Sequence, residues 1–324
     1  MSRSVVECAG ALALFCHNAR VSSFKIIAVR QHSGTPVKRA GWLGLTIIAI
    51  GLWGLYGIAF KLASDRLSPA AGQLLSTAGL LLPALFLVGP LARERRSTGG
   101  LVIGFSSGVC GALGNFAVLA SLGAGGKAAI VFPLTALYPL ITVIIAVLFM
   151  RERAHRVQVM GIVLAIVAVL LLSMDVSASY ARVDLKLSRA LLYAFAALVA
   201  FGLAAVFQKL ATNRVSAETA FATFAAGFIP PSILIMFLRP VGANLTAAPV
   251  LWAIAGGLLN GLGVLATLAA YRRGGKASVV TPLAAIYPMI TVILAVVFLR
   301  EKLVAVQIAG IALALLGGVL LSRE

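Results

Sequence analysis

The chain is divided into apolar blocks that are separated by short polar connections. Each block is about as long as the ~20 residues that an α-helix needs to cross a bilayer. Only 11% of the residues are charged, whereas a soluble domain carries about 25%. In hydrocarbon every backbone amide must be bonded within its own segment, so each block is predicted to be a helix. The sequence therefore predicts an all-α polytopic membrane protein.

Ten blocks are long enough to be transmembrane spans. They lie at residues 42–61, 69–89, 101–122, 128–150, 157–174, 190–210, 217–238, 249–270, 277–299 and 304–321. Residues 1–40 are rich in Lys and Arg, and their one apolar run, residues 9–15, is too short to span. A signal peptide has a similar outline, but Glu7 lies in the would-be basic region. We therefore predict a disordered, basic N-terminal extension outside the membrane.

The strongest pattern in the sequence is an internal repeat. Residues 125–173 align without a gap on residues 274–322, and more than half of the aligned positions are identical. The match continues upstream, where Lys61 pairs with Lys209 and Pro83 with Pro231. This predicts a first repeat at residues 41–174 and a second at residues 188–322. Because each repeat has an odd number of spans, five, the second must cross the membrane in the opposite direction, as inverted-repeat transporters do.

The basic residues of the loops predict the orientation of the chain. The net charge is +18, and a strongly positive charge is common in nucleic-acid-binding proteins. These Lys and Arg residues form no continuous basic face, however, so nucleic acid is not an expected partner. With the N-terminus inside, 18 of the 27 Lys and Arg residues lie on that side and 9 on the other. The positive-inside rule then predicts two cytoplasmic termini, in a plasma membrane of the bacterial inner-membrane kind.

Paired prolines interrupt spans four and nine at equivalent positions. Pro133 and Pro139 lie in one span, and Pro282 and Pro288 in the other. Matching interruptions in two repeats indicate a transporter binding site, although an ordinary proline kink is the alternative. A proline clashes with the carbonyl four residues earlier, which leaves that carbonyl free or bent. The affected carbonyls are those of Ala129, Thr135, Ser278 and Ala284.

Aromatic and hydroxyl side chains lie beside these prolines. Tyr138 and Thr142, like their repeat mates Tyr287 and Thr291, are four residues apart and share one helix face. We predict that they line a central cavity between spans one, three, four, six, eight and nine, together with neutral residues of those spans. These further candidates are Thr135, Pro139, Pro288, Asn115, Asn260, Trp53, Tyr56 and Gln208. Ordinary packing between helices is the alternative interpretation of each.

Charged residues are confined to loops and span ends. Lys61 and Lys209 close spans one and six and are candidates for attracting substrate at opposite mouths of the cavity, or else anchors that extend to the interface. No acid lies at membrane depth, so no buried proton relay is expected. The sequence shows no cluster of metal ligands or catalytic groups in a span, so we expect no metal, no cofactor and no enzymatic activity.

These features resemble the EamA family of the drug/metabolite transporter superfamily. The resemblance covers residues 42–322 and rests on the five-span repeats, on residues 133–139 and 282–288, and on the acids Glu152 and Glu301 that follow them. Gln158 with Gly161, and Gln307 with Gly310, complete it.

The resemblance implies a ten-helix fold and a secondary, alternating-access transporter of small metabolites, amino-acid-like or drug-like compounds. The expected partners are the lipid bilayer and a small-molecule substrate, and the interpretation allows a homodimer. The competing class is a passive channel or a structural or assembly membrane protein. Such proteins have no need of an inverted pair of broken helices.

Overall fold

The computed structural model describes residues 41–87, 97–141, 156–173, 188–239, 246–273, 280, 283–284 and 286–321. All of them belong to one compact unit, residues 38–324. Within these ranges every regular element is an α-helix, which confirms the predicted fold class. Several predictions fall outside the described residues, namely those on residues 1–40, Thr142, Glu152, Ser278 and Pro282 and on the Lys209 and Gln158 side chains.

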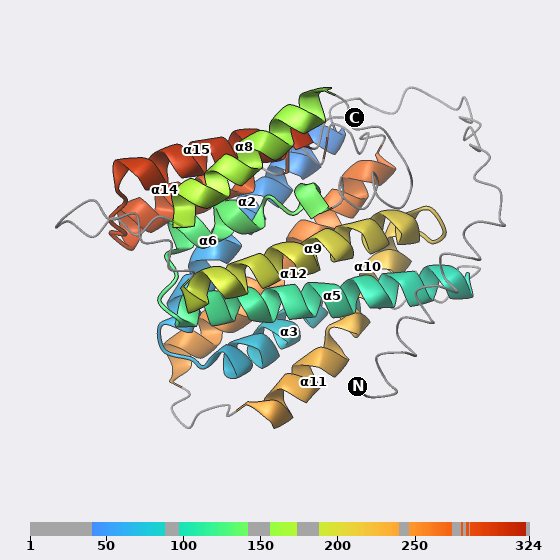
Figure 1. Ribbon diagram of the computed structural model, residues 1–324. Coiled ribbons are helices and arrows are strands. Elements are labelled where there is room, and N and C mark those ends of the chain that lie inside the picture. The colour runs from blue at the N-terminus through green and yellow to red at the C-terminus, as the bar shows by residue number, and fades with distance from the viewer. Residues whose placement is uncertain are drawn as a thin grey trace, which may run out of the picture. The chain divides into compact units, whose positions relative to one another are not determined.

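The helices follow the predicted order of the spans (Figure 1). The first repeat contains α2 (Gly41–Ser64), α3 (Pro69–Leu85), α5 (Thr98–Gly123), α6 (Ala128–Thr135) and α8 (Arg156–Ser173). The second contains α9 (Arg189–Thr212), α10 (Ala217–Gly227), α11 (Ile229–Leu238), α12 (Ala247–Arg272), α14 (Tyr287–Phe298) and α15 (Ala305–Leu321). Among the described residues, five helices are long and apolar enough to cross a membrane, and five shorter apolar helices occupy the other predicted spans.

Serine side chains fix where several helices begin. Ser68 accepts a hydrogen bond from the Ala71 N–H at the start of α3, and its repeat mate Ser216 accepts one from the Thr219 N–H at the start of α10. The first turn of a helix has N–H groups without intrahelical partners, and a serine cap satisfies one of them. Equivalent helices of the two repeats therefore begin with the same kind of serine cap.

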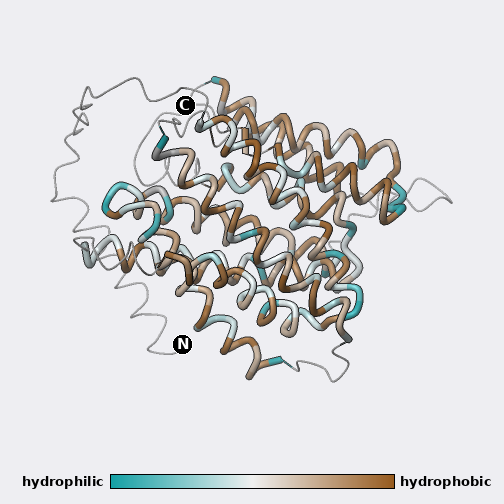
Figure 2. Tube along the Cα trace, turned by 180° about the vertical axis from the view of Figure 1, so that it is seen from behind, coloured by the Kyte–Doolittle hydropathy of each residue, from teal (hydrophilic) through white to brown (hydrophobic). Residues whose placement is uncertain are grey.

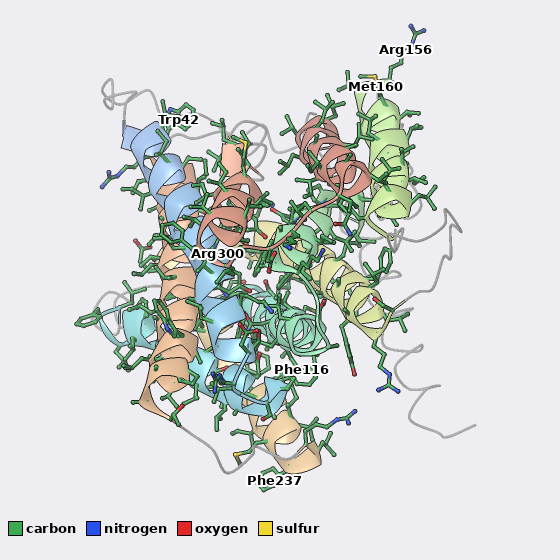
Figure 3. All side chains as sticks on the ribbon, turned by 90° about the vertical axis from the view of Figure 1, so that its left-hand side faces the viewer. Trp42, Phe116, Arg156, Met160, Phe237 and Arg300 are labelled. Atoms are coloured by element: carbon green, nitrogen blue, oxygen red, sulfur yellow. The ribbon has the colours of Figure 1, made fainter. Side chains whose placement is uncertain are left out.

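Apolar side chains cover the outside of the helix bundle. Figure 2 shows hydrophobic residues along the helices and hydrophilic residues mainly at their ends. Met160 on α8 and Phe237 on α11 are 52% and 77% exposed, and both lie at the periphery in Figure 3. A soluble protein rarely exposes a contiguous apolar surface of this kind. The protein is therefore a multi-pass membrane protein whose outer surface faces lipid.

The two repeats pack on each other through duplicated helix pairs. Helix α5 packs along α9 as α12 packs along α2, and α10 crosses α5 as α3 crosses α12. Helices α8 and α15, the last spans of the two repeats, lie side by side (Figure 1). When the repeats are exchanged, the α5–α9 pair maps onto α12–α2, the α10–α5 pair onto α3–α12, and the α8–α15 pair onto itself. This is expected for inverted repeats related by a pseudo-two-fold axis.

Glycines bring the crossing helices into backbone contact. At each of four glycines an added Cβ would meet a carbonyl oxygen of the facing helix. Small residues allow such close approach between transmembrane helices. The four contacts are Gly108 on Phe224, Gly227 on Phe105, Gly257 on Ser76 and Gly79 on Ile254. Exchange of the repeats converts the first contact into the third and the second into the fourth. Equivalent glycines and carbonyl oxygens therefore make equivalent contacts in the two repeats.

Candidate functional site

Span four is broken next to its second proline. Helix α6 ends at Thr135, a turn follows, and the helix resumes at Pro139. The Thr135 carbonyl accepts a hydrogen bond from the Tyr138 N–H at 3.1 Å, so it is bent into a turn rather than left free. Eight helical residues span about 12 Å, less than half of the ~30 Å thickness of the hydrocarbon, so the break lies part-way along span four.

Span nine is interrupted at the equivalent position. Helix α14 begins at Tyr287, and Pro288 occupies its first turn, where a missing N–H costs nothing. The Ile286 N–H donates to the Leu283 carbonyl at 3.1 Å in the turn before the helix. Tyr138 and Tyr287 therefore both lie at the junction between a break and the helix that follows it.

The two breaks meet through the side chain of Tyr287. It packs against the buried cluster that contains Leu134 of α6 and Leu137 of the turn after it. Its ring packs edge-on against Trp53 of α2, with 5.8 Å between the ring centroids. This one side chain therefore joins spans one, four and nine.

Thr291 lies one turn after Tyr287 and also faces α2. It is fully buried, and its hydroxyl donates to the Gly54 carbonyl at 3.0 Å. A Cβ at Gly57 would collide with the Thr291 side chain, so the glycine makes room for it. The four-residue spacing thus places Tyr287 and Thr291 on one helix face.

Tyr56 connects α2 to the helices of spans three and four. Its hydroxyl donates to Asn115 Oδ1 of α5 at 3.3 Å. Its ring lies 5.5 Å from that of Phe132 in α6 and 4.3 Å from that of Phe60, measured between centroids. Both Tyr56 and Asn115 are buried, so neither side chain is open to solvent in this conformation.

Asn115 belongs to a buried network of neutral polar side chains. Its Nδ2 donates to Gln73 Oε1 at 2.8 Å and to Ser76 Oγ at 3.1 Å. Gln73 Nε2 in turn donates to Ser232 Oγ at 3.0 Å and to Thr77 Oγ1 at 3.3 Å. Unpaired amides are costly in hydrocarbon, and the network satisfies them. The sequence interpretation missed the three hydroxyls, although Ser76 and Thr77 lie one helical turn from Gln73.

The polar network has no counterpart in the other repeat. The repeat mates of Gln73 and Asn115 are Phe221 and Val264. Both belong to an apolar cluster that also contains Phe224. The hydrogen bonds of the network join α2 and α3 to α5 and α11, so the interface between the helices of the two repeats is polar at one end and aromatic at the other.

The other predicted site residues are placed less centrally. Asn260 and Gln208 are half-buried, and no hydrogen bond joins either side chain to another described residue. Pro139 and Pro288 are buried at the breaks. Lys61 lies at the end of α2, where its ammonium is 2.8 Å from the Asp65 carboxylate on the same helix end.

The described part of the site contains only neutral side chains. The described acids are Asp65, Glu218 and Glu301, and each lies near the end of a helix. In the described ranges no group of three or more His, Cys, Asp or Glu side chains could hold a metal ion. The described side chains around the breaks therefore offer hydroxyls, amides and aromatic rings.

Comparison with known proteins gives the chain a family. The model of the EamA-like transporter family matches it twice, at residues 40–174 and 188–323. A segment of 90 residues is 40% identical to an uncharacterized protein of Methanocaldococcus jannaschii. The segment covers 28% of this chain and 65% of that protein, so the match spans less than two thirds of the relative. A crystal structure described only as that of a protein shares the fold, with a TM-score of 0.58 and 20% identity over 86% of this chain and 98% of the other. The chain therefore belongs to the EamA-like transporter family, a family of membrane transporters in the drug/metabolite transporter superfamily.

Proposed function

We propose that the chain is a secondary transporter that moves small metabolites, amino-acid-like or drug-like compounds, by alternating access. The observation that carries this proposal is the meeting of the two broken spans, where α14, which begins at Tyr287, packs against α6, which ends at Thr135. Binding sites at the interface of inverted repeats are typical of transporters that exchange two conformations. The closed packing of Thr135 and Thr291 corresponds to a state in which this region is shielded from water.

The neutral side chains favour a substrate that is uncharged, zwitterionic or amphipathic. Tyr287 and Trp53 supply aromatic surface, and Thr135 and Tyr287 supply hydroxyls. A fully charged cation would find no carboxylate among the described residues at this depth. Even the lowest insertion scales put a charge at mid-membrane at about 2.5–3.5 kcal/mol, so selection for such a cation would be hard to build from these groups.

Counterflow in proteoliposomes tests the proposed function. Purified protein is reconstituted with an unlabelled amino acid, nucleoside or cationic dye inside, and uptake of the labelled compound is followed. We expect transient accumulation above equilibrium for at least one neutral or zwitterionic compound, because a carrier exchanges one bound substrate for another. A passive channel would give flux without accumulation, and a structural protein would give none, so either result across the panel would contradict the proposal.

We also propose that both termini face the cytoplasm and that the membrane is the plasma membrane. The excess of Lys and Arg, 18 against 9, supports this orientation. A reporter that fluoresces only in the cytoplasm, fused after Glu324, is expected to be active. The matched control is a fusion after Arg66, beyond the first span, which is expected to be silent. The reverse pattern would show that the orientation is inverted.

A further inference from the structure

Glu301 caps a helix that belongs to the other repeat. It lies in the connection between α14 and α15, and its Oε1 and Oε2 accept hydrogen bonds from the N–H groups of Ala128 and Ala129, both at 2.9 Å. These are the first two N–H groups of α6, whose own N-cap residue, Lys127, provides no side-chain cap. A carboxylate at a helix N-terminus satisfies orphan donors and complements the helix dipole.

Lys127 makes the reciprocal contact. Its ammonium donates to the carbonyl of Lys302, the residue after Glu301, at 2.6 Å. Glu301 therefore bonds from the connection after α14 to the start of α6, and Lys127 bonds from the start of α6 to that connection. Hydrogen bonds that involve an ionised group are stronger than neutral ones. The two repeats are thus joined at this point by three charge-assisted hydrogen bonds.

The backbone is bent into an unfavourable conformation to present Glu301. Arg300, labelled in Figure 3, has a φ of 53°, in the left-handed region. A residue with a long side chain adopts this region only where the surrounding structure holds it there. The Glu301 N–H is tied back to the Ala295 carbonyl of α14 at 3.2 Å. The carboxylate is therefore held on a rigid connection rather than on a free loop.

Fixing the start of α6 also fixes its other end. The helix is only eight residues long, its last residue is Thr135, and α14, which begins at Tyr287, packs against it. We propose that Glu301 is a positioning residue that acts through α6, sets the place of Thr135 opposite Tyr287, and holds this face of the transporter closed. The proposal rests on the proposed function. Opening the site toward this face requires the carboxylate to leave the two amides.

A thiol-accessibility assay tests this role without any substrate. In full-length protein with Cys8, Cys16 and Cys110 replaced by Ser, Thr135→Cys reports whether the buried end of α6 is reached by a membrane-impermeant maleimide. We expect Glu301→Gln to raise the reaction rate about tenfold, because the amide nitrogen cannot accept one of the two bonds and the charge is lost. Glu301→Asp keeps the charge and should give an intermediate rate. Asp65→Asn removes an ion pair within one helix end and should leave the rate unchanged.

Transport kinetics separate a positioning role from a general loss of structure. Once a substrate is known, Glu301→Gln should lower kcat about tenfold and change KM far less, with partial recovery in Glu301→Asp. An unchanged maleimide rate in Glu301→Gln, or the same increase in Asp65→Asn, would overturn the proposal. If wild-type protein transports nothing but the maleimide rates follow the expected order, the proposed function fails while the closing role of Glu301 stands.

Discussion

Tyr287→Ala is expected to lower kcat/KM for transport about 30-fold. The variant removes the ring that packs on Trp53 and the hydroxyl that Tyr287 offers to a substrate in the proposed site. An aromatic contact contributes ~0.5–1.5 kcal/mol and a hydrogen bond ~0.5–1.5 kcal/mol, so their joint loss is about 2 kcal/mol. Tyr287→Phe keeps the ring and should lose only about fivefold. Initial rates of counterflow against substrate concentration measure both.

Glu218→Gln is the matched control for this prediction. Glu218 lies in the first turn of α10, away from the breaks, and is one of the described acids. If transport needed a carboxylate in the second repeat, this variant would lose activity. We expect it to keep activity, and we expect Tyr138→Ala to be impaired because Tyr138 is the repeat mate of Tyr287. Loss in the Glu218 variant alone, with the tyrosine variants unaffected, would contradict the mechanism.

Gly257→Ala is expected to destabilise the protein by ~1–3 kcal/mol, toward the upper end of that range. The new Cβ would meet the backbone carbonyl of Ser76 on α3, which cannot move without shifting the whole helix. Gly79→Ala, on the other side of the same crossing, should behave alike because its Cβ would meet the Ile254 carbonyl. Unfolding in mixed micelles by chemical denaturant measures the loss.

Gly51→Ala supplies the control at another helical glycine. Nothing lies within 4 Å of a Cβ at Gly51, so the change adds a methyl group without a collision. A helical Gly→Ala change then stabilises the protein by about 0.5–1 kcal/mol. Equal effects at Gly51 and Gly257 would show that the helix crossings tolerate side chains and that the backbone contacts do not stabilise the fold.

The sequence allowed the spans, the repeats and the breaks to be predicted because each depends on local chemistry. An apolar block of sufficient length predicts a transmembrane helix, and a proline such as Pro139 or Pro288 interrupts the helix in which it lies. The shared face of Tyr287 and Thr291 followed from helical spacing, and the structure places both against α2. The lining of a central cavity by these two residues and by the other candidates stays a prediction.

Other contacts depend on which helices become neighbours, which spacing does not reveal. Asn115 was selected as a costly amide, but its bond to Gln73 follows from the rotation of α5 against α3. Glu301 was noted only as an acid after a span, because a carboxylate in a connection is usually solvated. Its bond to the N-terminus of α6 depends on which helix begins beside this connection, which the sequence does not reveal. A comparison of repeat mates, such as Ser232 with Ala84, is the signal that could have revealed the one-sided network.

Under the proposed alternating access, the unequal ends of the interface predict that the empty protein opens more readily on one side of the membrane than on the other. In alternating access the helices separate at one end and then at the other. Separating Gln73 from Asn115 and Ser232 exposes groups that water can solvate, whereas separating Phe221 and Phe224 exposes apolar surface at ~25 cal/mol per Å². We therefore expect the two open orientations of the unloaded protein to differ in free energy. Under the proposed function we expect the substrate gradient to set the direction of net flux, and this difference in free energy to set how often the unloaded protein samples each side.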